Sequence, residues 1–145
     1  ADFRPVKRAP LSEPVNYAAI ADTVNFPPPA DLVALEKLVV AGGYQLANLL
    51  PIGPNQNPAS KNNPRQLQIL QAKRLISGMK AFPERTLVVT VPAERSDRLR
   101  DLDQLLTELG VGRDGNIQTR NWEPKDDERN FLVQDDASGV SLYLE

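Results

Sequence analysis

Cysteine and histidine are both missing from this chain of 145 residues. Without cysteine there is no disulfide, no thiolate nucleophile and no sulfur ligand for zinc. Without histidine there is no imidazole to act as a general base near neutral pH, no serine–histidine dyad and no imidazole ligand for a transition metal. Most hydrolytic mechanisms are thereby excluded. The sequence predicts no enzymatic activity, no catalytic residue, no cofactor and no metal site.

Two further absences limit the partners of the chain. Its formal net charge is −2, so it lacks the concentrated basic surface that attracts nucleic acid. No apolar run approaches the roughly 20 residues that a membrane-spanning helix requires. Apolar residues make up 41% of the sequence and charged residues 25%, which is typical of a globular chain with one domain. The sequence starts at Ala1 instead of methionine, and one interpretation is that a signal peptide or lipid-anchored leader has been removed.

Prolines are concentrated in the first 30 residues, at Pro5, Pro10, Pro14, Pro27, Pro28 and Pro29. Proline removes a backbone donor and favours extended geometry, so we predict an extended arm over 1–30 and a single α/β domain over 31–145. A strand within "VNYAAIADTVNF" is the alternative for part of the arm. We expect the arm to become ordered on a partner or to lend a strand to an open sheet edge.

The first predicted helix spans 31–41. Asp31 is a suitable N-cap for it, and Gly42 with Gly43 supplies a left-handed stop. Only Glu36 and Lys37 interrupt its apolar surface, so we expect it to be buried on most sides. The following "YQLANLLPI" is predicted to be a strand.

Turn-forming residues predict a loop over 53–63, and a helix follows over 64–80 with Asn63 as its cap. The β-branched run "TLVVTV" at 86–91 is long enough for a central strand and too short for a helix. Near the end of the chain, "FLVQ", the turn "DDASG" and "VSLYLE" predict a hairpin or a loop leading to a last strand.

The stretch 87–122 predicts one complete β-α-β unit. Its helix, at 96–109, begins at Ser96 or Asp97, repeats leucine at helical spacing and ends at Gly110. "GNIQTRNW" then forms the returning strand. Phosphate-binding turns need glycines between strand and helix, and "VPAERSDRLRD" has none. Ser96 lies in no G-x-S-x-G elbow, so we expect this unit to build a surface and Ser96 to serve as a helix cap.

Helices and strands thus alternate at least twice. This pattern predicts an α/β (α+β) fold, with a mixed sheet of three to five strands and about three helices packed on one face. The stretches 31–52 and 64–122 are candidates for a degenerate repeat.

Acidic residues occur in three groups. Asp101 and Asp103 lie two apart on a helix and point in different directions. The runs 126–128 and 135–136 fall in predicted loops, where aspartate commonly forms turns, and no EF-hand pattern is present. We therefore expect structural roles for all of them. Trp122 is expected to be buried, or to anchor a partner if it is exposed.

The two ends of the chain resemble a known family. Three stretches carry the resemblance: "DFRPVKRAPLSEP" at the start, "LVVTVPAERSDRLRDLDQLLTELGVGRDGNI" later and "GVSLYLE" at the end. They resemble the CpaD/RcpB-like pilus-assembly lipoproteins of the Flp (tight-adherence) system. Residues 44–85 would form an insertion, and the family's cysteine-containing C-terminal segment is absent. The resemblance implies a periplasmic lipoprotein near the outer membrane that assists a secretin channel.

A second resemblance concerns the OmpA-like peptidoglycan-binding domains. "DLVALEKLVV", "LLPIGPNQNPASKNN" and "QLQILQAKRL" are similar to their outline of helix, strand, Asn-rich loop and long helix. That family binds peptidoglycan through an aspartate in a G-H-T-D-like loop and an arginine in an N-x-x-L-S-x-x-R-A helix. Here the loop "IGPNQN" has no acid, and Asn63 is followed by Gln66, Leu67 and Leu70 where leucine, serine and arginine belong.

These observations lead to two functional hypotheses of different classes. The first is a non-enzymatic assembly or scaffolding protein of a bacterial envelope machine, associated with a pilus or secretin and acting by protein–protein contact. The alternative is an OmpA-like cell-wall binding domain, which titration with peptidoglycan fragments distinguishes. An enzyme with carboxylate-only chemistry is the third hypothesis, and a glycosidase-like pair of carboxyls about 5–9 Å apart in a cleft would support it.

Overall fold

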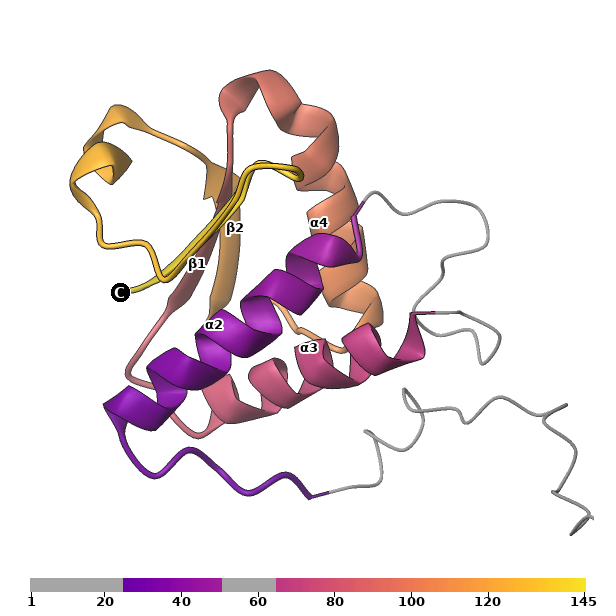
Figure 1. The fold of residues 1–145 in the computed structure, drawn as a ribbon, viewed down its shortest axis with the longest axis vertical. Helices are drawn as coiled ribbons and strands as arrows, with labels where there is room; N and C mark the ends of the chain where they lie inside the picture. Colours follow the sequence, from indigo (N-terminus) through magenta and orange to yellow (C-terminus); the bar gives the residue numbers. More distant parts are fainter. Residues whose placement is uncertain (1–24, 51–64) are drawn as a thin grey trace, which may run out of the picture.

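The computed structural model describes residues 25–50 and 65–145 (Figure 1). Most of the predicted 1–30 arm, the 53–63 loop and the helix start at Asn63 lie outside the described residues. In chain order the elements are α2 (Leu32–Asn48), α3 (Gln66–Lys80), β1 (Leu87–Val91), the 3₁₀ helix η1 (Ala93–Arg95), α4 (Ser96–Glu108), β2 (Ile117–Asn121), the 3₁₀ helix η2 (Pro124–Glu128), β3 (Val133–Asp135) and β4 (Val140–Leu144).

The four strands form one mixed sheet in the order β2-β1-β4-β3. β1 pairs parallel with β2 and antiparallel with β4, while β3 pairs antiparallel with β4. The predicted α+β fold, with a mixed sheet and about three helices, is confirmed. The β-branched strand β1 is central, and all five of its residues are buried. Its burial on both faces explains why "LVVTV" shows no alternation of polar and apolar residues.

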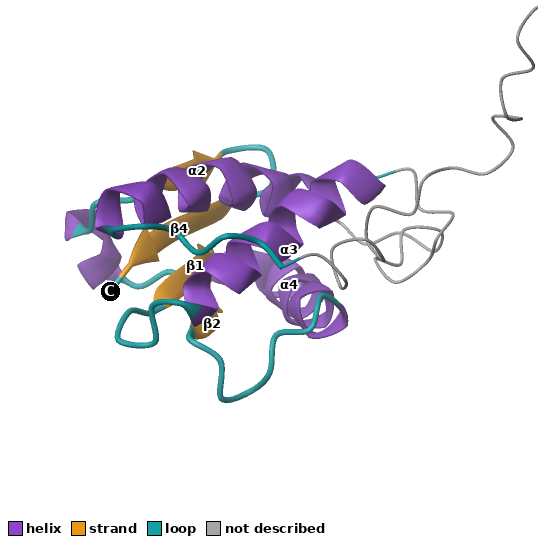
Figure 2. Ribbon diagram, turned by 90° about the horizontal axis from the view of Figure 1, so that it is seen from below, coloured by secondary structure: helices purple, strands orange, loops and turns teal. Residues whose placement is uncertain are grey.

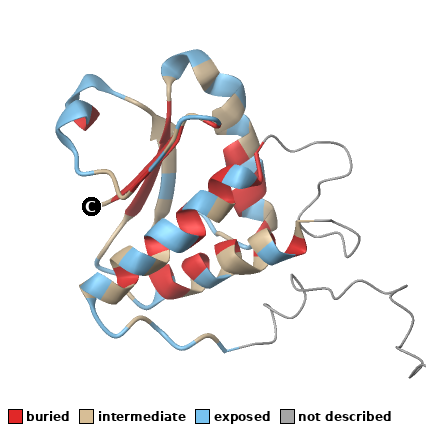
Figure 3. Ribbon diagram, in the orientation of Figure 1, coloured by how far each residue is buried: buried red, intermediate tan, exposed pale blue. Residues whose placement is uncertain are grey.

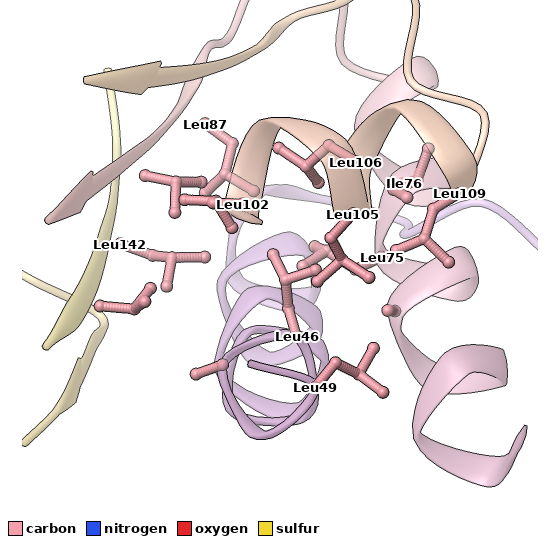
Figure 4. Close-up of a cluster of buried hydrophobic side chains, with 14 of the residues drawn as sticks. Leu46, Leu49, Leu75, Ile76, Leu87, Leu102, Leu105, Leu106, Leu109 and Leu142 are labelled. Atoms are coloured by element: carbon pink, nitrogen blue, oxygen red, sulfur yellow. The ribbon is translucent and has the colours of Figure 1, made fainter. Parts of the chain in front are cut away.

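The two faces of the sheet differ in what covers them. Leu87 and Val89 of β1 and Leu142 of β4 share the face that packs on the helices. α2 contacts β3 and β4, α4 contacts β1 and β2, and α3 packs on α2 (Figure 2). Leucines from all three helices meet the strand leucines in one cluster, with the strands on one side and the helices on the other (Figure 4). Figure 3 shows that the burial is concentrated where helices and strands face one another.

α2 is longer than the sequence predicts. Asp31 does cap it, with its carboxylate accepting the amide of Ala34 at 2.8 Å, but the helix continues through Gly42 and Gly43 to Asn48. The predicted stop at Gly42 and the predicted strand in "YQLANLLPI" are therefore wrong. The repeat of 31–52 in 64–122 is wrong too, since its first unit holds no strand within the described residues.

The glycines of α2 are sites of close packing. A Cβ at Gly42 would lie 2.6 Å from Cβ of Leu75 on α3, and a Cβ at Gly43 would lie 3.0 Å from a methyl group of Val133 on β3. Glycine lowers the stability of a helix interior by roughly 1 kcal/mol relative to alanine. Here that cost is offset because the two adjacent glycines let α2 pack closely on α3 at Gly42 and on the sheet at Gly43.

Replacing Gly42 by alanine is expected to lower the free energy of unfolding by about 1–2 kcal/mol. The gain in helix propensity is outweighed by overpacking of about 1–3 kcal/mol, because Cβ of Leu75 is held close to its backbone and cannot rotate away. Gly78→Ala is the matched control. There the new Cβ would lie 2.3 Å from Cδ2 of Leu38, the far end of a flexible side chain. Urea denaturation should rank Gly42→Ala below both the parent and Gly78→Ala; the opposite ranking would contradict this packing argument.

α4 begins without the predicted cap. The single turn η1 leads directly into it, Arg95 takes the N-cap position, and no side chain makes a cap hydrogen bond. Ser96 is the first helical residue and is exposed, so the prediction that it caps the helix is wrong. The predicted end is confirmed: Gly110 has a φ of +96°, a conformation that favours glycine.

Asn116 joins three parts of the fold just before β2. Its amide nitrogen lies 2.7 Å, 2.8 Å and 2.9 Å from the carbonyl oxygens of Met79, Phe82 and Arg85. These carbonyls belong to the end of α3 and the connection to β1. A single side chain therefore fixes where α3 stops and where the parallel pair β1–β2 begins.

The predicted C-terminal hairpin is present as β3 and β4. In its turn, the Asp135 carboxylate accepts the backbone amide of Ser138 at 3.1 Å and its hydroxyl at 2.6 Å. Gly139 has a φ of +77°. Asp135 thus has the turn-forming role that the sequence predicts.

Candidate interaction surface

The second face of the sheet carries a buried ionic cluster. The Arg120 guanidinium on β2 binds the Asp126 carboxylate on η2 with two hydrogen bonds, of 2.9 Å and 2.6 Å. It also donates to the Tyr143 hydroxyl on β4, and that hydroxyl lies 3.3 Å from Asp126. The backbone amide of Glu123 donates to Asp126 at 2.8 Å. Every member of the cluster thus has partners inside the protein.

The pKa of Asp126 is lowered in this cluster. The hydrogen bond from Arg120 is the largest cause, and burial opposes it by favouring the neutral acid. The pKa of Arg120 is raised, chiefly by the same hydrogen bond with Asp126. Both groups are therefore held in their charged forms. A carboxylate that is stabilised as the anion and fully covered is a poor proton donor and is not open to a substrate.

Trp122 packs beside this cluster. Its ring stacks on Phe131 with the ring centres 4.6 Å apart, and Phe131 meets Tyr143 edge-on at 5.5 Å. The indole nitrogen donates to Asp127 at 3.2 Å. Trp122 is half-buried, so the prediction that it is buried is confirmed only in part. The ionic cluster and the aromatic stack together hold the connection 122–132 against the sheet.

Among the acids for which the sequence predicts structural roles, Asp126 and Asp103 have partners that differ from those of simple turns. Asp126 is the buried partner of Arg120. In the sequence, nothing in the run "DDE" at 126–128 distinguishes Asp126 from the two acids that follow it. Asp103 accepts a hydrogen bond from the Thr119 hydroxyl of β2 and so ties α4 to that strand. No group of three or more acidic side chains in residues 25–50 and 65–145 is arranged to hold a metal ion.

The outer side of α2 is apolar and exposed. Among the described residues, the large hydrophobic side chains with the greatest exposure are Val33 at 58%, Leu67 at 56%, Tyr44 at 41% and Val40 at 37%. We call these four the α2–α3 strip. Three of them lie on α2 at positions i, i+7 and i+11, which places them along one stripe of the helix. The prediction that α2 is buried on most sides is therefore wrong for this stripe.

Two hollows flank the α2–α3 strip. One has a volume of about 550 Å³ and extends from Tyr44 to Leu67 and Gln71 on α3. The other has a volume of about 400 Å³ and extends from Val33 to Leu132 before β3. Val40 and Ala41 line both hollows, so the strip and its hollows form one continuous surface that crosses α2.

The rim of this surface carries little charge. Gln45, Gln68 and Gln71 border the first hollow, and Glu36 and Lys37, of opposite charge, border the second. Such a rim offers no attraction to a phosphate or to a strongly charged segment. It fits an apolar partner surface with neutral polar edges. The sequence does contain a signal for it, because α2 has apolar residues on every side and only two charges.

None of the helices in the parts of the chain that the structure describes has the length and apolar character needed to cross a bilayer. No family model matches this chain, and no curated protein and no solved structure is significantly similar to it.

Proposed function

We propose that this protein is a non-enzymatic assembly or scaffolding module that binds a partner protein through the α2–α3 strip. The observation that carries the proposal is the exposed stripe of Val33, Val40 and Tyr44 with Leu67 beside it. Large contiguous patches of exposed apolar surface are uncommon on monomeric proteins, and they commonly mark sites of contact with a partner. The polar cluster around Asp126, by contrast, is closed and holds the fold together.

The partner that fits this surface is an amphipathic helix. The hollows on either side of Val40 can receive side chains that repeat at i, i+4 and i+7 on one face of a helix. The stripe from Val33 to Tyr44 spans 11 helical steps, or roughly 16 Å at 1.5 Å per residue, so a partner helix of about 12 residues would cover it. Its flanks would be polar and uncharged, to match the glutamines of the rim.

Peptide selection tests this proposal directly. The full chain would be used to select from a displayed library of segments of about 12–16 residues taken from bacterial envelope proteins. We expect the enriched peptides to carry apolar residues at i, i+4 and i+7 and to gain helicity on binding. Val33→Asp and Leu67→Asp should each weaken their binding by tenfold or more, since each puts a charge where an apolar anchor docks (about 1.4 kcal/mol per tenfold).

Gln104→Asp, an exposed change on α4 away from the strip, is the matched control and should bind like the parent. The proposal would be contradicted if the selection enriched extended peptides and if Val33→Asp and Leu67→Asp left the affinity for those peptides unchanged. Micromolar binding of peptidoglycan fragments in a calorimetric titration would favour the OmpA-like alternative instead.

For the cellular setting we propose the bacterial envelope, with the protein in the periplasm, anchored at the outer membrane as a lipoprotein, and a pilus or secretin assembly as the partner. The support is the resemblance of both ends of the chain to the CpaD/RcpB-like lipoproteins. A module that acts only by contact also suits a chain without histidine or cysteine. Crosslinking from position 33 or 67 to a secretin subunit, absent from position 104, would be the expected result.

A further inference from the structure

Asp114 and Gly115 lie in the connection between α4 and β2. Of all the aspartates and asparagines in the sequence, Asp114 alone precedes a glycine. Glycine has no side chain to hinder its own backbone nitrogen. In an Asp-Gly pair this nitrogen can therefore reach the side-chain carboxyl carbon of the aspartate and close a five-membered ring. The chain thus contains one pair with the intrinsic chemistry of aspartate isomerisation.

The Asp114 carboxyl group is free to react. Residues 112–115 are all exposed. None of the residues that the structure describes forms a hydrogen bond or an ion pair with the Asp114 side chain. Asp135 provides the contrast, because its carboxylate accepts the amide and the hydroxyl of Ser138 at 3.1 Å and 2.6 Å. Asp114 lacks such contacts, which would hold its carboxyl group away from the following amide.

One backbone hydrogen bond opposes the reaction. The amide of Gly115 donates to the carbonyl of Gly112 at 3.0 Å, and the nitrogen must leave this bond before it can attack. A single hydrogen bond in an exposed turn slows the reaction by no more than about tenfold, the equivalent of about 1.4 kcal/mol. The pair belongs to neither flanking element, since α4 ends at Glu108 and β2 begins at Ile117. Opening the turn therefore requires no unfolding of the sheet.

We propose that Asp114 is a site of spontaneous isomerisation to isoaspartate in the folded protein. The Gly115 nitrogen forms a bond to Cγ of Asp114, and the hydroxyl of the protonated carboxyl group leaves with the amide proton as water. Water then opens the resulting succinimide. Addition at the former main-chain carbonyl breaks its bond to the nitrogen and gives isoaspartate, whereas addition at Cγ restores aspartate. One water is released and one is consumed, so the mass of the chain is unchanged.

The contacts that fix this connection lie on either side of the reacting pair. Before it, the amide of Val111 donates to the carbonyl of Leu106 at 2.9 Å. After it, the side chain of Asn116 binds three carbonyls near the end of α3. Isoaspartate lengthens the main chain by one carbon at Asp114, and the exposed segment 112–115 can absorb this change. The product is therefore a folded protein with an exposed isoaspartyl carboxylate, the group that repair methyltransferases modify with S-adenosylmethionine.

Ageing of the full chain at physiological temperature and neutral pH tests the proposal, with one sample native and one in guanidinium chloride. A protease that cleaves before aspartate but not before isoaspartate, followed by mass spectrometry, measures the loss of cleavage before residue 114. In the native sample we expect isoaspartate to accumulate there at no less than about one tenth of the rate in the denatured sample, because only the turn hydrogen bond separates the two states. Cleavage before Asp135 should stay complete in the native sample.

Two variants at the same exposed position serve as controls. Asp114→Glu keeps the charge but would have to close a six-membered ring, so it should stay unmodified. Asp114→Asn should react faster than the parent through the same ring, with ammonia as the leaving group in place of water. Without any denaturant, the aged parent should accept methyl groups from S-adenosylmethionine through a protein-isoaspartate methyltransferase, and aged Asp114→Glu should accept far fewer.

An aged native parent that keeps aspartate at 114 would overturn the proposal, whether or not the denatured sample reacts, since the turn would then hold the amide out of reach. Equal methylation of the aged parent and of Asp114→Glu would overturn it as well, because the isoaspartate would then lie elsewhere in the chain.

Discussion

Leu102→Asp is expected to leave the protein largely unfolded. Leu102 is completely buried on α4, and Leu106, one turn later, is 4% exposed. Shortening a buried leucine to alanine costs about 2–5 kcal/mol, and a carboxylate without a partner in the same place adds a desolvation cost. A loss of roughly 4–6 kcal/mol or more is comparable to the total stability of a typical domain, about 5–15 kcal/mol. Leu106→Asp should behave similarly.

The chain offers a chemically identical control for this change. Leu67→Asp makes the same substitution at an exposed leucine in the first turn of α3, where a negative charge is favoured by the helix dipole. Circular dichroism during thermal and urea denaturation should show Leu67→Asp within about 0.5 kcal/mol of the parent and Leu102→Asp without a cooperative transition. If Leu102→Asp melted like the parent, the face of α4 that carries Leu102 would not be part of the core.

Asp126→Asn should have the second largest effect, lowering the free energy of unfolding by about 2–4 kcal/mol near neutral pH. The Asp126 side chain is completely buried and that of Arg120 is 25% exposed. Removing the carboxylate leaves the guanidinium with only the more distant and exposed Glu123 carboxylate, at 4.0 Å. Breaking a buried pair costs about 3–5 kcal/mol, less where one partner is partly exposed. The connection 122–132 would lose its main contact with the sheet. Urea denaturation measures the loss, and faster amide exchange across η2 would locate it.

The pH dependence of this effect has a defined sign. The pKa of Asp126 is lower in the folded protein than in the unfolded chain, where it is about 3.9. Its contribution to stability is therefore fully present above the unfolded pKa and is lost as the pH falls through the folded value. The difference in unfolding free energy between parent and Asp126→Asn should be constant from about pH 7 to pH 5 and should shrink below about pH 4.

Glu128→Gln is the control for the pH experiment, since Glu128 is an exposed acid of the same 3₁₀ helix. It should differ from the parent by no more than about 0.5 kcal/mol at every pH. A constant difference between parent and Asp126→Asn down to pH 2 would mean that the ion pair with Arg120 does not stabilise the fold.

Elements whose signals are local could be predicted from the amino-acid sequence. The β-branched run of β1, the leucine spacing of α4, the glycine that ends it and the Asp135 turn of the final hairpin each depend on neighbours along the chain. These elements were predicted, together with the mixed sheet and its three helices. The absence of histidine and cysteine likewise limits the chemistry of any site without reference to the fold.

Features that depend on neighbours in space became visible only in the folded protein. Gly42 and Gly43 look like a helix stop in the sequence, but their lack of side chains serves contacts with Leu75 on α3 and Val133 on β3. Asp126 resembles the acids beside it until η2 places it against Arg120. The exposure of Val33 and its stripe depends on α2 and α3 meeting along a different side of α2. The spacing of residues along the chain determines which of them share a face of a helix or strand. Which other element covers that face is determined by packing between segments far apart in sequence.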